Sequence, residues 1–401
     1  MTYISHRIKR ISVSQTLEMS KRSRELRDKG IDIIDMSVGQ PDFPTPPHIK
    51  QAAKEAIDKN FTFYTPVPGY PDLREAIVKK LKKDNNLEYA KDQIVVTTGA
   101  KQALANTLLT LVDKGDEILM PAPYWVSYAE LVNLAEGKST FIKTDISTNY
   151  KATAEQIEKA ITKNTRLLVY SSPSNPAGSI YSKNELSDIA DVIKKHENIY
   201  VISDEIYEHI NFIGKHESIA QFEDIKDRVI VINGMSKGYA MTGWRIGYMA
   251  APKWLAESCI KLQGQYTSGA SSISQKAALA GLNGDNIYTM GMNQAFKERR
   301  DLIVSIMEEI PGFKTYVPEG AFYIFPEVKE YFGKINNYIN IKNASDLSMF
   351  LLNEAHVATV PGTAFGNPDC IRFSFAIGKD KITTAMERIK NALSTLSDYS
   401  S

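Results

Sequence analysis

Short apolar runs alternate with longer segments of helical periodicity along most of the chain. The runs occupy residues 94–98, 117–120, 166–170, 199–202 and 229–232. Short buried strands that alternate with helices are typical of a mostly parallel sheet flanked by helices. Such a sheet binds ligands at the carboxyl ends of its strands. The pattern therefore predicts an α/β fold with its chemistry at one edge of the sheet.

A smaller set of elements is expected at the two ends of the chain. A charged segment over 14–29 has helical character, ends at Gly30 and is followed by a short strand over 31–36. The other expected elements are helices over 295–306 and 379–396 and strands over 321–325 and 370–375. These segments predict a second, smaller α/β domain.

The composition excludes several classes of function. Of the 401 residues 43% are apolar, and 48 Lys and Arg residues balance 47 Asp and Glu residues. Without a basic excess, neither a nucleic-acid surface nor a polybasic membrane surface is expected. The apolar runs are too short to cross a bilayer, and the N-terminus lacks an apolar targeting core. Cys259 and Cys370 have neither metal-ligand spacing nor a disulfide framework, so a cytoplasmic protein is expected.

The most informative feature is a lysine between two small residues. Lys237 stands between Ser236 and Gly238, shortly after the apolar run 229–232. An amine at the end of a buried strand, with nothing bulky beside it, is placed to form an imine. Arg245 lies beyond a glycine-rich turn, and with the Ser236 hydroxyl it is suited to hold a phosphate. Together they indicate pyridoxal phosphate, although each residue alone also fits a solvated surface group.

The other apolar runs also lead to groups with useful chemistry. Gly99 and Ala100 open a helix that extends to about Leu111, so backbone N–H groups there can approach an anion closely. The candidates that follow other runs are Trp125, Asn175, Asp204 and Tyr207. We expect these groups to converge on one edge of the sheet.

A set of motifs spans nearly the whole chain. They lie at residues 39–43, 64–66 with Gly69, 98–102, 124–125, 175–178, 204–207, 236–237 with Arg245, and 371–374. In sequence and order they resemble class I aminotransferases of the pyridoxal-phosphate fold type I superfamily, and among these the bacterial aspartate/prephenate aminotransferases. The resemblance implies a large cofactor-binding domain over 46–287 and a small domain formed by 1–45 and 288–401.

The resemblance implies roles around the cofactor ring. Lys237 would carry the cofactor and move the proton at the substrate's Cα, and Asp204 would pair with the protonated ring nitrogen. Asn175 and Tyr207 would hydrogen-bond the ring oxygen, and Trp125 would stack on the ring. The residues alone leave simpler alternatives. Asp204 also fits a helix N-cap, Asn175 fits a turn, and the two aromatic side chains fit core packing.

The resemblance also assigns residues to the cofactor's phosphate. On the chain's own side these are Gly99, Ala100, Lys101, Ser236 and Arg245. Tyr64 resembles the residue that reaches the phosphate of the neighbouring subunit, which implies a homodimer with shared active sites. By itself Tyr64 equally fits an exposed aromatic residue in a turn.

For the substrate, the resemblance implies that Arg372 holds the α-carboxylate with help from the Gly39 N–H, beside Trp125 and Asn175. The planar guanidinium matches a carboxylate with two hydrogen bonds. Arg372 lies between Ile371 and Phe373 in a predicted strand, so facing solvent is the alternative for it.

The resemblance places Lys101 and Thr16 near the distal carboxylate of an acidic substrate. A lysine in that pocket favours an acidic side chain. The alternatives are an exposed first-turn residue for Lys101 and helix surface for Thr16. The chain departs from related sequences at residues 12–16, where a basic residue is replaced, which argues against prephenate, and at Ala177, which replaces a threonine.

The expected activity is transfer of the amino group of an acidic L-amino acid, with aspartate favoured, to 2-oxoglutarate in ping-pong order. Alternatives are an aminotransferase for aromatic amino acids or prephenate, and a β-lyase on the same scaffold. A non-enzymatic regulator with a preceding DNA-binding domain is disfavoured, because the first motif begins at Gly39.

Overall fold

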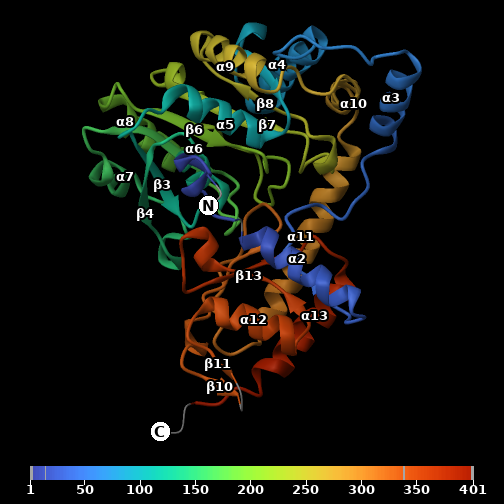
Figure 1. Cartoon of the computed structure of the whole chain (residues 1–401), viewed down its shortest axis with the longest axis vertical. Helices are drawn as coiled ribbons and strands as arrows, with labels where there is room; N and C mark the ends of the chain where they lie inside the picture. The colour runs from blue at the N-terminus through green and yellow to red at the C-terminus, as the bar shows by residue number, and fades with distance from the viewer. Residues whose placement is uncertain (1–2, 14, 337–338, 399–401) are drawn as a thin grey trace.

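The computed structural model describes residues 3–13, 15–336 and 339–398, and a seven-stranded sheet organises the larger part of the molecule (Figure 1). The strand order is β2-β8-β7-β6-β5-β3-β4, and β8 runs antiparallel to both its neighbours. The strands are β2 (Ile94–Thr97), β3 (Glu117–Ala122), β4 (Lys138–Lys143), β5 (Thr165–Ser171), β6 (Tyr200–Asp204), β7 (Val229–Gly234) and β8 (Gly247–Ala250). The mostly parallel sheet predicted from the sequence is therefore confirmed.

Two strands of this sheet were not predicted. β4 lies at the sheet's edge, and Ile142 is its only buried residue, so it lacks an apolar run. β8 has four residues and begins at Gly247, which leaves too short a pattern to recognise. Both strands follow from tertiary packing rather than from local sequence.

Helices cover both faces of the sheet, because alternate strand residues face opposite sides. Val95 packs with α5 (Ala100–Leu111), α6 (Ser127–Leu134) and α9 (Lys253–Tyr266), whereas Ile94 and Val96 belong to the core on the other face. The helices on that face are α3 (Pro47–Asp58), α4 (Pro71–Asn85), α7 (Ala154–Ala160), α8 (Lys183–Lys195) and α10 (Ser272–Asn283).

A second apolar core organises the smaller part of the molecule, in the lower half of Figure 1. Its helices are α11 (Ile287–Met307), α12 (Ala344–Glu354) and α13 (Lys379–Leu393), with α2 (Gln15–Asp28) beside them. Its strands are β1 (Ile34–Asp35), which pairs with β12 (Val357–Ala358), and the sheet β13 (Val360–Pro361), β14 (Ile371–Ser374) and β9 (Tyr323–Ile324). A hairpin joins β10 (Ile335–Asn336) to β11 (Ile339–Asn340).

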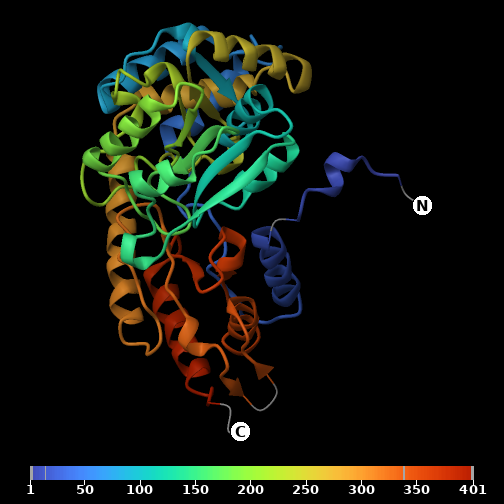
Figure 2. The same cartoon turned by 90° about the vertical axis from the view of Figure 1, so that its left-hand side faces the viewer.

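Figure 2 shows that the long helix α11 runs alongside both parts, while the first described residues, with α1 (His6–Lys9), extend away from the body. None of the described helices is long and apolar enough to cross a membrane.

The expected elements of this smaller part are present with different ends. Ser14, the expected start of the first long helix, lies outside the described residues, and the helix is described from Gln15. The strand expected over 31–36 is only two residues long, because its pairing with β12 is limited to Ile34 and Asp35. α11 begins at Ile287, eight residues before the expected start at 295. The division into two domains stays a prediction.

The backbone passes unusually close to itself where β8 begins. A Cβ atom added at Gly247 would lie 2.2 Å from the backbone nitrogen of Ala100, at the start of α5. Gly99, the preceding residue, has φ +80°, a conformation that favours glycine. The two glycines therefore let the N-terminus of α5 lie directly against the first residue of β8.

Replacing Gly247 by alanine should destabilise the protein by about 1–3 kcal/mol, because the added methyl group has backbone rather than a flexible side chain as its neighbour. Urea denaturation measures the loss. Gly291 in α11 has no atom within 4 Å of its added Cβ and serves as the control. Gly291→Ala should be neutral or stabilising by up to about 1 kcal/mol. Equal stability of the two variants would contradict the close approach.

Candidate active site

A cavity of about 330 Å³ lies at the carboxyl ends of the parallel strands, between the main sheet and the smaller part of the molecule. It brings together predicted residues from segments far apart in the sequence. These are Thr16, Gly39, Ala100, Lys101, Trp125, Asn175, Asp204, Tyr207, Ser236, Lys237, Arg245 and Arg372. The volume is in the range of small-molecule sites. The expectation that these groups lie at one edge of the sheet is met.

Two predicted residues do not line this cavity. Gly99 lies just behind it, where an added Cβ would be 2.3 Å from Nη2 of Arg245. Tyr64 is 97% exposed and borders a separate surface hollow formed by residues 62–65 and 269–272. Any contact of Tyr64 with a cofactor must therefore be made outside this chain's own cavity.

Lys237 lies in the loop that follows β7. Its Nζ donates a hydrogen bond to the carbonyl oxygen of Gly39. Burial, followed by the charges of Arg372 and Arg245, lowers the pKa of Lys237 to about 7. A lysine with such a pKa carries a substantial neutral, nucleophilic fraction at neutral pH.

Asp204 is the last residue of β6, and its carboxyl group is 4% exposed. The Tyr128 hydroxyl donates to its Oδ2 at 2.7 Å, and the Ile206 N–H donates to its Oδ1 at 3.3 Å. Burial raises the pKa of Asp204 to about 6, while the bond from Tyr128 acts in the opposite direction. A turn rather than a helix follows, and the bond from Ile206 makes Asp204 a cap of that turn while its other oxygen is held by Tyr128.

Arg372 is 2% exposed, so the alternative in which it faces solvent is wrong. Its Nη1 donates to Oδ1 of Asn175 at 2.9 Å, and its Nη2 donates to the carbonyl oxygen of Ser37 at 2.6 Å. The Tyr323 ring lies 4.4 Å from the guanidinium carbon, and Nε has no hydrogen-bond partner in the part of the chain that the structure describes. An unpaired buried donor in a cavity wall is suited to an anionic ligand.

Two tyrosines of the site were missed by the sequence analysis. The Tyr128 hydroxyl donates a hydrogen bond to Asp204, and the hydroxyl groups of Tyr323 and Tyr207 are hydrogen-bonded to each other at 2.8 Å. A Cβ atom at Gly39 would lie 2.5 Å from the Tyr323 hydroxyl, which explains the glycine there. Tyr323 lies within an apolar run and Tyr128 within a helix, so no pattern in the sequence separates them from core residues.

The far end of the cavity is cationic. Arg245 adopts φ +58° and donates from Nη1 to the carbonyl oxygen of Thr242 at 2.9 Å, beside the N-terminus of α5. Lys101 lies with its Nζ 4.9 Å from the centre of a Trp125 ring, and burial followed by the charge of Arg245 lowers its pKa. The hydroxyl of Thr16 is buried and has no hydrogen-bond partner within residues 3–13, 15–336 and 339–398.

The charges of the cavity are unbalanced. Its cationic side chains are Lys101, Lys237, Arg245 and Arg372, and Asp204 is its only lining carboxylate among the described residues. Such a set attracts a ligand with more than one negative charge, and Asp204 can hold one positive group within it. This arrangement suits an anionic ligand that contains a protonated ring nitrogen or amine.

The sequence is similar to a family of enzymes over most of its length. A family model described as aminotransferase class I and II matches residues 31–389. A probable aspartate/prephenate aminotransferase from Rickettsia bellii is 44% identical over 99% of this chain and 100% of its own length. An aspartate aminotransferase from Pinus pinaster is 41% identical over 97% of this chain and 80% of its own length.

Solved structures show the same similarity. The aspartate aminotransferase from Rhizobium meliloti superposes with a TM-score of 0.96 at 40% identity, covering 99% of this chain and all of that one. The aspartate aminotransferase from Thermus thermophilus, determined with maleate, has a TM-score of 0.92 at 34% identity and covers 98% of this chain and all of that one.

The pKa of Lys237 provides a test of this geometry without any ligand. Arg372→Met should raise the pKa of Lys237 above its value of about 7, because one of the charges that lower it is removed. The measurement is the pH dependence of covalent labelling of Lys237 in the cofactor-free protein, read by mass spectrometry. Arg166→Met, at the opposite end of β5, is the control and should leave the midpoint unchanged. If the labelling of wild-type Lys237 had its pH midpoint at the pKa of an exposed lysine, the burial of Lys237 would be contradicted.

Proposed function

Because this chain belongs to the aminotransferase class I and II family, we propose that it transfers the amino group of aspartate to 2-oxoglutarate with pyridoxal phosphate as its cofactor. The observation that carries the substrate assignment is Lys101, a cavity cation that no other step of the reaction requires. The relatives named aspartate or aspartate/prephenate aminotransferase support the same substrate class.

The cavity fits pyridoxal phosphate at both ends. Asp204 would hold the ring nitrogen, and Tyr207 and Asn175 would hold the ring oxygen. Arg245, Ser236 and the backbone at the start of α5 would hold the phosphate, since a helix N-terminus favours an anion. When bound, pyridoxal phosphate supplies an electron sink for the electron pair released at the substrate's Cα.

The protein's own groups would perform the remaining steps. Lys237, with a pKa of about 7, would remove the proton from Cα as general base and return a proton as general acid. Arg372 would bind the α-carboxylate through its guanidinium, whose Nε lacks a partner. The amino donor and the oxo-acid acceptor would use the same cations in turn, which requires ping-pong order.

Assigning one anion to each cation leaves Lys101 for the substrate's side chain. Arg372 would take the α-carboxylate and Arg245 the phosphate, while Lys237 serves the chemistry. Lys101 then faces the rest of the substrate beside the unpaired hydroxyl of Thr16. A distal carboxylate is the group that such a pair binds best. The Thermus structure with maleate, itself a dicarboxylate, agrees with this substrate class.

The alternatives have less support. An aromatic side chain would leave Lys101 buried without an anion, which lowers affinity. None of the relatives described above is named a lyase, so β-elimination is not favoured.

The substrate assignment is tested by a panel of amino acids. We expect aspartate and glutamate to have higher kcat/KM values than phenylalanine or leucine. Lys101→Ala should cost about 1.5–3 kcal/mol of transition-state binding with aspartate and much less with leucine, because only aspartate loses a charged partner. Lys101→Arg keeps the charge and should lose less.

If Lys101→Ala lost equal transition-state binding with aspartate and with leucine, Lys101 would be assigned to the helix or the cofactor instead. A wild-type preference for aromatic or aliphatic donors would exclude the aspartate assignment and leave the aminotransferase family unaffected. Lys237→Ala provides the inactive reference in the same assay.

We also propose a homodimer in which Tyr64 completes the partner's phosphate site. Large apolar side chains are exposed near Tyr64 and along the first residues of the chain. They include Phe63 at 79%, Tyr266 at 72%, Tyr3 at 92% and Val13 at 77% exposure. Exposed apolar groups of this size favour burial against another surface. The 97% exposure of Tyr64 supports a contact outside its own chain.

The shared site is tested with two inactive variants. Tyr64→Ala and Lys237→Ala, mixed and allowed to exchange subunits, should regain activity, because each hybrid dimer contains one site with both residues intact. The measurement is turnover after exchange against that of the separate variants. Full activity from a wild-type protein that is monomeric at assay concentration would contradict this proposal.

A cytoplasmic location is proposed on the basis of the cysteines. Cys259 and Cys370 are both buried free thiols. Free thiols persist in reducing compartments, where disulfides are rare.

A further inference from the structure

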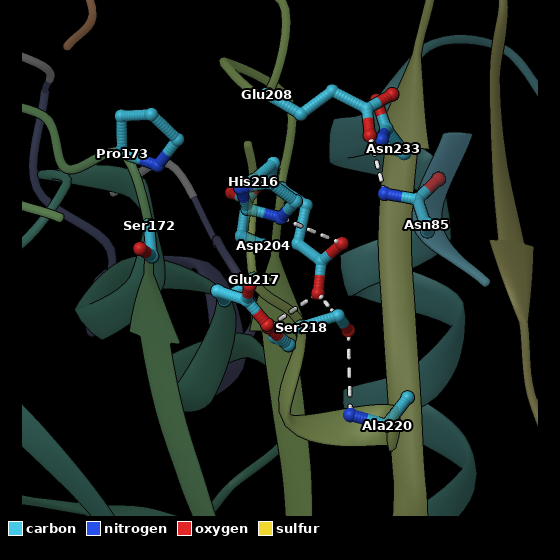
Figure 3. A network of polar contacts seen from close by, with 12 residues as sticks. Asn85, Ser172, Pro173, Asp204, Glu208, His216, Glu217, Ser218, Ala220 and Asn233 are labelled. Atoms are coloured by element: carbon cyan, nitrogen blue, oxygen red, sulfur yellow. Dashed lines mark hydrogen bonds and ion pairs between the residues drawn. The ribbon is translucent and has the colours of Figure 1, made fainter. Parts of the chain in front are cut away.

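The segment that carries Asp204 and Tyr207 has a second, buried face. The Glu208 N–H donates to the carbonyl oxygen of Glu205 at 3.0 Å, so the backbone turns with residues three apart on the same side. Asp204 and Tyr207 line the cavity. Glu205 and Glu208 are 0% and 7% exposed and contact the protein on the other side, as the position of Glu208 beside Asn85 in Figure 3 illustrates.

Glu208 is held by groups of α4 and by its own neighbour. The ammonium group of Lys80 forms an ion pair with Oε1, and Asn85 donates from Nδ2 to Oε2 at 2.9 Å. Nε2 of His209 lies 3.3 Å from Oε1. Burial opposes the charged carboxylate, but the charge and hydrogen bond of Lys80, together with His209 and His216, outweigh it and lower the pKa of Glu208. The side chains of Lys80 and Glu208 are 5% and 4% exposed.

Glu205 is held by the loop that contains His216. Ser218 and Ser203 donate from their hydroxyl groups to Oε1 at 2.5 Å and 2.9 Å, and Nε2 of His216 lies 3.0 Å from Oε2. Burial opposes protonation of His216, but Glu205, through its charge and a hydrogen bond, and the charge of Glu208 together outweigh it and raise the pKa of His216. Figure 3 shows Ser218 tied in turn to the backbone of Ala220.

Each carboxylate of the network lies beside a basic side chain. Lys80 forms an ion pair with Glu208, and His216, whose pKa is raised, has Nε2 3.0 Å from Oε2 of Glu205. Among the described residues, Oε2 of Glu205 and the ring nitrogens of His216 have no well-aligned hydrogen bond. Glu205, Glu208 and His216 have ligand atoms within 4.8 Å of one another, a spacing that also suits a metal ion, and such an ion would share Glu208 with Lys80.

We propose that this buried charge network, formed by Lys80, Glu205, Glu208 and His216, positions Asp204 and Tyr207 for the cofactor ring. Buried ion pairs add little net stability over apolar residues of similar size, but their directional contacts define one geometry. Each glutamate is held at several points, and each lies one residue from a cavity residue. The inference rests on the proposed function, because it assigns the network a task toward that cofactor.

The network also borders the loop of Lys237. A Cβ atom added at Gly238 would lie 2.6 Å from the His209 ring, so this ring packs directly under the residue after Lys237. His209 in turn contacts Glu208. A shift of Glu208 would therefore be transmitted to Lys237 as well as to Asp204 and Tyr207.

The test compares Glu208→Gln, Lys80→Met and the double variant with a control. Glu117→Gln is the matched control, since Glu117 is also buried and held by a lysine and a hydroxyl group, but at the start of β3, away from the cavity. Three quantities are measured for each protein. They are the melting temperature without cofactor, the absorbance and dissociation constant of added pyridoxal phosphate, and kcat and KM for aspartate.

Each single variant should lower kcat by about 10- to 100-fold, the effect of misplacing reacting groups by up to an ångström. It should also change the absorbance of the bound cofactor and weaken its binding. KM for aspartate should change little, because Arg372 and Lys101 lie on other elements. The double variant, in which neither charge is left unpaired, should regain part of the lost kcat. Glu117→Gln should lower only the melting temperature.

A lower melting temperature with normal kcat and normal cofactor absorbance in the single variants would show a purely structural network and overturn the proposal. A stoichiometric metal ion, removable with loss of cofactor binding, would also overturn it, because the ion rather than Lys80 and His216 would then hold the two glutamates. Failure of the proposed function is distinguishable, since the wild type itself would then bind no cofactor or transfer no amino group.

Discussion

The burial of Asp204 beside a group of cations is the interaction on which the site depends. Removal from water raises the pKa of this carboxyl group to about 6, and the same effect lowers the pKa of Lys237 to about 7. Burial thus brings the pKa values of the two groups close together, at about 6 for Asp204 and about 7 for Lys237. A general base works best when its pKa lies near the working pH, so desolvation prepares Lys237 for acid–base chemistry.

The fold supplies this arrangement through the direction of its strands. β6 and β7 are parallel, so Asp204 and the loop of Lys237 reach the same edge of the sheet. β8 returns antiparallel to β7, which means that the connection between them, including Arg245, stays at that edge. Gly247 and Gly99 then allow α5 to begin against Arg245. One reversed strand therefore places Lys237 and Arg245 within the same cavity.

The sequence predicted the groups that directly follow apolar runs, because a strand's end is fixed by the length of its buried pattern. Asp204 and Lys237 are of this kind. Arg372 was assigned only through the family resemblance, and its burial depends on the position of β14 between β13 and β9, which local sequence does not encode. Tyr128 and Tyr323 could not be recognised, since their hydroxyl groups become functional only through partners distant in the chain. The same holds for Lys80 and Glu208, which are 128 residues apart.

The two faces of the Asp204 segment have opposite electrostatic character. The cavity face meets an excess of cations, whereas on the rear face each carboxylate lies beside a basic side chain. Glu205 affects the pKa of Asp204 less than burial or the hydrogen bond from Tyr128 does. The rear network can therefore fix where Asp204 lies without deciding its charge, and that charge remains governed by what binds in the cavity. The position of Asp204 and its protonation are thus governed by different groups. Asp204 can therefore stay in place while the charges in the cavity change during a reaction.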